Sequence, residues 1–215
     1  MTAAVEPTRS AERALLVRRG IWLNYATIGY NSLEAVGALV AGLLAGSVAL
    51  IGFGFDSVIE VTAALAARWR LRADLNPVRR ERAELSTMRV VGICFFALAV
   101  YVTFDAIKTL ANREPPEGST FGIVILALSV IVMPILASKK KKVARALTSG
   151  ALEAEATQTS LCAYLSVIGL LGVGLNAALG WWWADPVAAL VMVPIIAREG
   201  LAGIRAKESS RDECC

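Results

Sequence analysis

Two acidic residues, Asp56 and Glu60, stand in a stretch of sequence that is otherwise strongly apolar. They are four residues apart, so in a helix both side chains lie on one face. A carboxylate in a membrane-spanning helix is costly to bury and usually marks a functional site. Two such groups repel each other unless one is protonated or a cation lies between them. The pair predicts a cation site, and the alternative is a protonated pair hydrogen-bonded to its neighbours.

A second set of chemically able residues recurs at helical spacing further along the chain. Glu155, Gln158 and Cys162 are separated by three and four residues, which stacks them on one side of a helix. Carboxylates, an amide oxygen and a thiolate form a mixed oxygen and sulfur set, which suits zinc better than magnesium or calcium. Taken singly, Cys162 is as readily a small buried hydrophobe and Gln158 a hydrogen-bond partner between helices.

A polar stripe precedes both sets, in an apolar segment near the N-terminus. Its members are Asn24, Thr27, Asn31 and Glu34, at spacings of three, four and three. The stripe either lines an aqueous path or holds helices together by hydrogen bonds, and the sequence leaves these readings equal. Together with Glu155, the last two members of the stripe, Asn31 and Glu34, form a candidate secondary polar pathway.

The elements that must position these residues are membrane-spanning helices. The chain has 215 residues, of which 56% are hydrophobic and only 19% charged, and its mean hydropathy is +0.59. That composition is too apolar for an ordinary soluble domain, and a spanning helix needs about 20 mostly apolar residues. We expect an all-α, polytopic membrane protein with six transmembrane helices, near Ile21–Gly46, Ser47–Ala67, Val90–Leu110, Ser119–Ser138, Gly150–Leu175 and Trp182–Ile204.

The basic residues predict the orientation of these helices. All but two of the 22 Lys and Arg residues fall on one side of a six-span arrangement, and the exceptions are Lys108 and Arg113. The positive-inside rule then places the N- and C-termini in the cytoplasm, and a bacterial inner membrane is expected. The positive net charge follows this topology, so no nucleic-acid partner is expected. The run Lys139–Lys142 is interpreted as a topology anchor that favours anionic lipid headgroups, and no Lys or Arg partner is expected for the acidic residues near mid-membrane.

Smaller signals concern packing and helix ends. Gly37, Ala41 and Ala45 recur every four residues and predict a close helix contact. Trp181–Trp183 predict an anchor at the level of the lipid headgroups. Asp185-Pro186 is typical of a helix start, with Asp185 as the capping residue.

Three stretches resemble the cation diffusion facilitators, a family of six-span exporters of zinc and related divalent ions. GSVALIGFGFDSVIE (46–60) is similar to the family's Gly-Ser-x-Ala-Leu stretch followed by Asp-x-x-x-Asp, with Glu60 in the second acidic place. AEATQTSLC (154–162) has the spacing of Ala-Asp/Glu-x-x-His-x-x-x-Asp, with Gln158 for His and Cys162 for Asp. ADPVAALVM (184–192) is similar to the opening of the family's sixth span.

The resemblance implies efflux of a divalent metal, Zn²⁺ or else Cd²⁺ or Co²⁺, by antiport with protons. It implies a metal site of Asp56, Glu60, Gln158 and Cys162, membrane lipid around the chain, a homodimer and no prosthetic group. The expected organisation is a cytoplasmic segment 1–19, a transmembrane domain 20–205 and a short cytoplasmic tail 206–215. We therefore expect a short form of the family, without the cytoplasmic metal-binding domain that usually follows span six.

Two other kinds of function are open. One is a metal-binding membrane protein that does not transport, such as a sensor or a partner subunit. The other is a proton or monovalent-cation pathway in which Cys162 is incidental. An enzyme is not expected, because the sequence has no nucleophile and base set, phosphate loop or cofactor motif.

Overall fold

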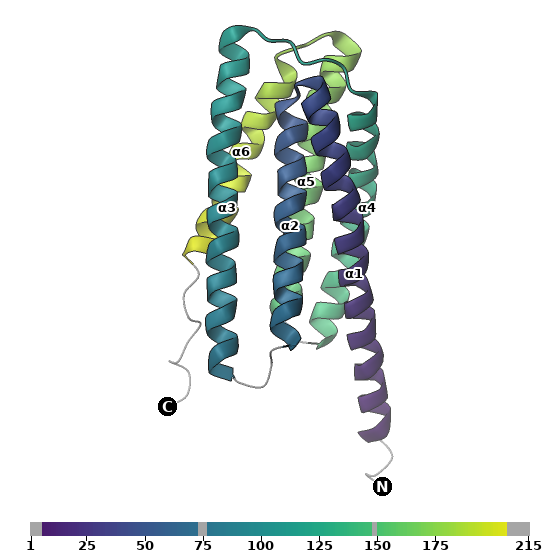
Figure 1. Cartoon of the computed structure of the whole chain (residues 1–215). Helices are drawn as coiled ribbons and strands as arrows, with labels where there is room; N and C mark the ends of the chain where they lie inside the picture. The colour runs from purple at the N-terminus through teal and green to yellow at the C-terminus, as the bar shows by residue number, and fades with distance from the viewer. Residues whose placement is uncertain (1–5, 73–76, 148–149, 206–215) are drawn as a thin grey trace.

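The computed structural model describes the backbone of residues 6–72, 77–147 and 150–205, and the side chains of 14–65, 89–147, 153 and 155–205. Within these residues the chain forms six helices that run up and down along one bundle (Figure 1). Their bounds are α1 Glu6–Ala45, α2 Val48–Arg72, α3 Pro77–Asn112, α4 Thr120–Leu147, α5 Gly150–Leu179 and α6 Ala184–Ile204.

Each helix contains a segment long and apolar enough to cross a membrane, which confirms the six-span prediction. Helices α1 to α4 extend beyond the predicted spans at the end of the bundle where α1 begins, whereas α5 begins and α6 ends as predicted. Helix α1 starts at Glu6, so most of the predicted segment 1–19 is helical. Helix α4 continues from the predicted end at Ser138 through the basic run to Leu147. The predicted tail 206–215 lies outside the described residues.

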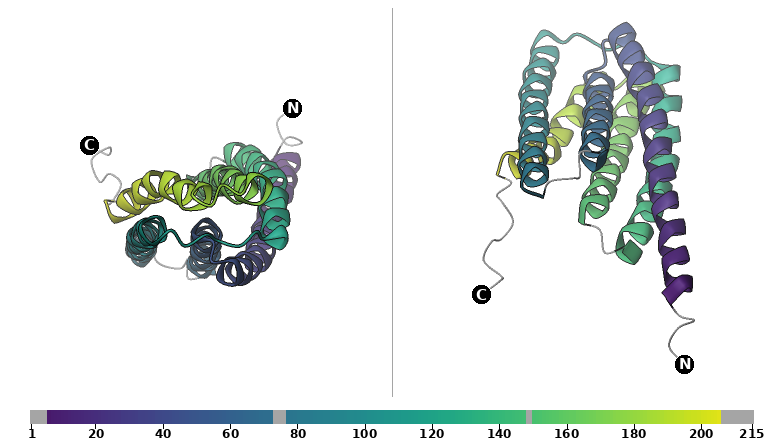
Figure 2. Two further views of the ribbon diagram at one scale, coloured as in Figure 1. Left: turned by 90° about the horizontal axis from the view of Figure 1, so that it is seen from above. Right: turned by 60° about the horizontal axis from the view of Figure 1, so that its bottom comes forward.

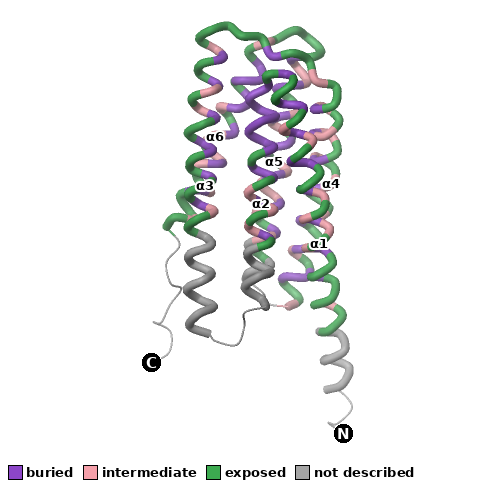
Figure 3. The backbone as a smooth tube through the Cα atoms, viewed as in Figure 1, coloured by how far each residue is buried: buried purple, intermediate pink, exposed green. Residues whose placement is uncertain are grey.

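Helix α2 occupies the middle of the bundle. Seen along the bundle axis, α3, α2 and α1 form one row, α6 and α5 lie opposite, and α4 closes the side between α5 and α1 (Figure 2). Helix α2 contacts α1, α3, α5 and α6. In the apolar stretch of α2, 61% of the residues are buried, compared with 39% or less in the apolar stretches of the other helices. Buried residues predominate along the upper half of α2 (Figure 3). The polar side chains Asp56, Ser57 and Glu60 of α2 are buried and are therefore held away from lipid.

The turn between α1 and α2 is defined by local backbone chemistry. Gly46 has φ +63°, a left-handed conformation that ends α1 at low steric cost. The Ser47 hydroxyl then accepts a hydrogen bond from the Leu50 amide at 3.1 Å and caps α2. The Asp185 carboxylate accepts hydrogen bonds from the Ser47 hydroxyl and from the Val48 amide. The start of α2 is thereby fastened to the start of α6.

The prediction that Asp185 caps its own helix is therefore wrong. The N-cap position of α6 is Trp183, which makes no side-chain capping bond. Asp185 lies in the first turn of α6, is buried, and points to the neighbouring helix end. A carboxylate is stabilised by the exposed amides of any helix N-terminus within reach, and here that of α2 is close enough.

Glycines allow the helices to approach one another at two contacts. A Cβ atom on Gly92 of α3 would lie 2.7 Å from the Gly200 carbonyl oxygen of α6, so the two backbones touch. A Cβ atom on Gly37 of α1 would lie 2.7 Å from Ile125 Cδ1 of α4. The second contact, with buried Ala41 and Ala45 on the same face, agrees with the packing predicted for this stripe of small residues.

Candidate metal site

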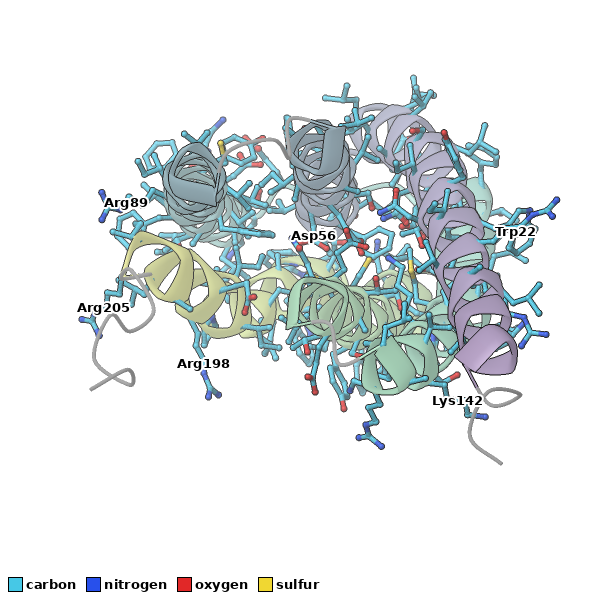
Figure 4. All side chains as sticks on the ribbon, turned by 90° about the horizontal axis from the view of Figure 1, so that it is seen from below. Trp22, Asp56, Arg89, Lys142, Arg198 and Arg205 are labelled. Carbon is cyan, nitrogen blue, oxygen red and sulfur yellow. The ribbon has the colours of Figure 1, made fainter. Side chains whose placement is uncertain are left out.

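The acidic residues of α2 lie inside the bundle and away from its lipid-facing surface. Asp56 and Glu60 are each 5% exposed. Seen from below, Asp56 lies between α2 and α5 near the centre, whereas Trp22, Arg89 and Lys142 lie at the periphery (Figure 4). The prediction that the two carboxylates share one helical face holds, and this face looks toward α1 and α5.

Helix α1 contributes a third carboxylate to the same region. Glu34 is buried, and its Oε2 accepts a hydrogen bond from the Ser57 hydroxyl of α2 at 2.9 Å. The same oxygen lies 3.9 Å from Cys162 Sγ. The polar stripe of α1 therefore reaches the acidic pair, and Glu34 belongs beside the proposed ligands.

Helix α5 faces the pair with two side chains from successive turns. The Thr159 hydroxyl donates to Glu60 Oε1 at 3.0 Å. The Cys162 thiol is buried and lies within hydrogen-bonding reach of the Asp56 carboxylate. Glu34, Asp56, Glu60 and Cys162, from three helices, are called here the acidic cluster.

Thr159 is a residue of the site that the sequence did not single out, while Gln158 was expected there. Gln158 is half-buried and Thr159 is fully buried. Adjacent side chains on a helix point about 100° apart. The rotation of α5 in the bundle therefore decides whether Gln158 or Thr159 faces α2. The sequence does contain a signal for Thr159, because it stands three residues before Cys162 and therefore lies on the same face of the helix.

Several buried polar atoms around the acidic cluster lack partners among the described residues. They are Asn31 Oδ1 and Nδ2, Glu34 Oε1, Glu60 Oε2 and Ser129 Oγ. The Asn31 amide lies beside the Glu60 carboxylate without forming a hydrogen bond of good geometry. Each buried polar group without a partner lowers the stability of the fold by about 1–3 kcal/mol. The gathering of several such groups around the acidic cluster therefore indicates a region that binds a polar ligand.

The acidic cluster does not form a complete metal-coordination site in this conformation. Among the described residues, no three Asp, Glu or Cys side chains are grouped closely enough to hold a metal ion as they stand. A bound ion would need side-chain rotation, or neutral oxygens such as those of Asn31 and Thr159, to complete its shell. Carboxylate and thiolate ligands of a transported ion must also let it go, so an incomplete shell is compatible with transport.

The acidic region has a buried basic neighbour, contrary to expectation. Lys140 of α4 is 1% exposed, and its Nζ lies 3.6 Å from Glu155 Oε2. The expectation that the whole run Lys139–Lys142 is a topology anchor at the lipid headgroups is therefore wrong at Lys140. The cause is the extra length of α4, which carries the run into contact with α5.

The first residue of the polar stripe, Asn24, contacts the first of the three α5 candidates, Glu155. Asn24 of α1 donates to both carboxylate oxygens of Glu155, at 3.1 and 3.0 Å. Thr27 instead donates to the Leu23 carbonyl of its own helix. The stripe therefore holds α1 to α5 at Asn24, whereas Asn31 lies beside Glu60 and Glu34 is a member of the acidic cluster.

Comparisons with known proteins identify the family of the chain. The chain matches the model of the cation efflux transmembrane domain over residues 25–207. It is 28% identical to the cadmium, cobalt and zinc/H⁺–K⁺ antiporter of Bacillus subtilis, over 80% of this chain and 56% of that protein. It is 23% identical to the cation-efflux pump FieF of Shewanella oneidensis, over 75% of this chain and 56% of that protein.

A vertebrate protein is also similar. Transmembrane protein 163 of Xenopus laevis is 25% identical, over 63% of this chain and 48% of that protein. The chain thus spans about half the length of the curated relatives it matches. Because the family model covers nearly the whole membrane bundle that holds the acidic cluster, the chain belongs to the cation efflux family.

Proposed function

We propose that this protein exports a divalent metal ion from the cytoplasm in exchange for protons, with Zn²⁺ as the cargo and Cd²⁺ or Co²⁺ as further candidates. The proposed ligands are Asp56, Glu60, Gln158 and Cys162. To these we add Glu34, because its carboxylate lies 3.9 Å from the Cys162 sulfur. Homodimer formation in a bacterial inner membrane remains part of the proposal.

The observation that carries the proposal is the gathering of three carboxylates and a thiol deep in the bundle, with free oxygen atoms on Glu34 and Glu60. Burying several anions together is strongly unfavourable unless protons or a cation neutralise them. A divalent ion removes this cost and binds both oxygen and sulfur ligands if it is zinc-like. The names of two relatives, a cadmium, cobalt and zinc antiporter and a cation-efflux pump, support the same class of cargo.

Proton exchange follows from the chemistry of the ligands. A metal binds carboxylate and thiolate in their deprotonated forms, so loading releases protons and unloading takes them up. The chain has no histidine, which leaves the acidic cluster itself as the proposed proton carrier. Movement of α2 against α5, which contact each other, would expose the cluster alternately to the two sides.

The test is transport by purified protein in proteoliposomes that contain a pH-sensitive dye, over a panel of Zn²⁺, Cd²⁺, Co²⁺, Mn²⁺ and Mg²⁺. We expect metal uptake with opposite proton movement for zinc-like ions, reduced at least about tenfold in Asp56→Asn, since losing one charged ligand removes more than about 1.4 kcal/mol. Asp105→Asn is the matched control, because Asp105 is on α3 with its carboxylate near Tyr101. Full flux in Asp56→Asn would refute the site.

The other two functions appear as separate outcomes of the same test. Metal bound by the protein without uptake into vesicles would identify a binding protein that does not transport. Proton flux that needs no metal and is unchanged by Cys162→Ser would identify a proton or monovalent-cation pathway.

A further inference from the structure

Lys140 is the strongest electrostatic anomaly of the bundle outside the proposed ligands. Its neighbours Lys139 and Lys142 are exposed and Lys141 is half-buried, but Lys140 is fully enclosed by the bundle. Removing an ammonium group from water is strongly unfavourable unless acceptors and counter-charges surround it. A surface anchor would not require this burial, so Lys140 must serve an interior group.

The contacts of Lys140 lead directly to the acidic cluster. Its Nζ lies 3.6 Å from Glu155 Oε2 and donates to the Thr159 hydroxyl at 3.3 Å. That hydroxyl donates in turn to Glu60 Oε1 at 3.0 Å. One side chain therefore separates the lysine ammonium from a proposed metal ligand.

The position of the ammonium is fixed from the other side as well. Glu155 accepts two hydrogen bonds from Asn24 of α1, so the counter-ion of Lys140 is itself held in place. Helices α1, α4 and α5 thus hold the Lys140 ammonium group in place beside the Glu60 carboxylate of α2. The fully buried Asn31 amide lies next to Glu60 without a hydrogen bond of good geometry among the described residues, which also favours binding of a polar ligand in this region.

We propose that Lys140 is a built-in counter-cation of the acidic cluster, which weakens the binding of divalent metal and so sets the concentration at which cargo is taken up. The inference rests on the proposed function. A fixed positive charge offsets part of the negative charge of the empty cluster, and it repels an arriving divalent ion. Affinity is thereby held low enough for the ion to be released after each cycle, because cargo that binds too tightly leaves slowly.

The proposal makes an unusual prediction, because removal of a buried charged residue should improve binding. In Lys140→Gln, we expect the Kd for Zn²⁺ measured by calorimetry in detergent to fall about tenfold, as expected for one unit charge within about 10 Å at an intermediate dielectric constant. Release of ⁶⁵Zn²⁺ from the loaded variant should slow by a similar factor. Lys139→Gln removes the same charge from an exposed position of the same helix turn, and its Kd should stay within about twofold of the native value.

A second comparison decides the matter if the single variant is unstable. Glu155→Gln and the double variant Lys140→Met with Glu155→Gln differ only by the lysine, and the double variant leaves no unpaired buried charge. We expect the double variant to bind Zn²⁺ about tenfold more tightly than Glu155→Gln alone. Equal or weaker binding in either comparison overturns the proposal and assigns Lys140 a structural role.

Failure of this inference is distinct from failure of the proposed function. If the native protein binds Zn²⁺ in an Asp56-dependent manner and Lys140→Gln leaves the Kd unchanged, the metal site stands and the counter-cation is refuted. If neither the native protein nor any variant binds metal, the proposed function fails and this inference with it.

Discussion

At the scale of single residues, the chemistry of this protein depends on which side chain of each helical turn faces inward. Cys162 is buried against Glu34 and Asp56, whereas Cys94 of α3 is exposed. The described residues thus include two thiols in very different surroundings. A thiolate beside carboxylates favours zinc, cadmium and cobalt over magnesium.

Cys162→Ser tests the contribution of the thiol. Serine keeps the size and hydrogen-bonding capacity but loses the soft sulfur ligand, so we expect Zn²⁺ and Cd²⁺ affinity to fall about tenfold to a hundredfold, with Cd²⁺ affected more. The measurement is metal binding by calorimetry, followed by uptake into proteoliposomes.

Cys94→Ser provides the matched control, with binding expected at the native level. Unchanged Zn²⁺ and Cd²⁺ binding in Cys162→Ser would remove the thiol from the proposed ligand set and leave an all-oxygen site.

At the scale of elements, α2 is positioned by contacts at both its start and its middle. Its N-terminus is fastened to α6 through Asp185, and its acidic face is bonded to α1 through Ser57 and to α5 through Thr159. The α3 and α6 helices pack backbone to backbone at Gly92 and Gly200. Close packing of this kind supplies much of the stability of a membrane bundle, where apolar surface alone gives little preference for helix contact over lipid.

The glycine contact predicts opposite effects of one substitution at two positions. Gly92→Ala forces a methyl group against the backbone of α6, so we expect the protein to lose about 1–3 kcal/mol of stability. Gly29→Ala places the methyl group where no other atom lies within 4 Å, and the higher helix propensity of alanine should leave stability unchanged or raise it by up to about 1 kcal/mol.

Thermal unfolding of both variants in the same detergent measures the difference. A Gly92→Ala protein as stable as the native one would show that α3 and α6 do not touch at this point in the membrane.

At the scale of the whole molecule, the pattern of charge agrees with an even number of spans. The start of α1, the ends of α2, α4 and α6 and the starts of α3 and α5 all point toward one end of the bundle (Figure 1). This end carries most of the basic residues, whereas the opposite end is capped by short turns and by stacked Trp181 and Trp183. From the positive-inside rule we propose that the basic end faces the cytoplasm.

Cysteine labelling tests this orientation. In a protein without native cysteines, Glu117→Cys and Arg145→Cys place one reactive thiol at each end, and both positions are exposed. A membrane-impermeant maleimide added to intact cells should label Glu117→Cys, and should label Arg145→Cys only after permeabilisation. The reverse pattern would invert the orientation and with it the direction of transport.

Much of the fold could be predicted because a membrane imposes one simple physical constraint on the segments that cross it. Every backbone polar group in lipid must be satisfied within the helix, so apolar stretches of sufficient length identify spans without reference to the rest of the protein. Helix ends were less predictable. Helix α4 runs past Ser138 because its lysines can extend beyond the hydrocarbon or find partners within the bundle, and hydropathy registers neither case.

The sequence by itself determined the class of the protein, the six spans and the two acidic or thiol-bearing faces, Asp56 with Glu60 and Glu155 with Cys162. Local spacing suffices for these features, because residues on one helix keep fixed angular relations. Only the tertiary structure decided that Glu34 joins them, that Thr159 contacts Glu60, that Asp185 caps α2 and that Lys140 is buried. Each of these contacts joins two helices, and the rotation of one helix against another depends on packing across the whole bundle.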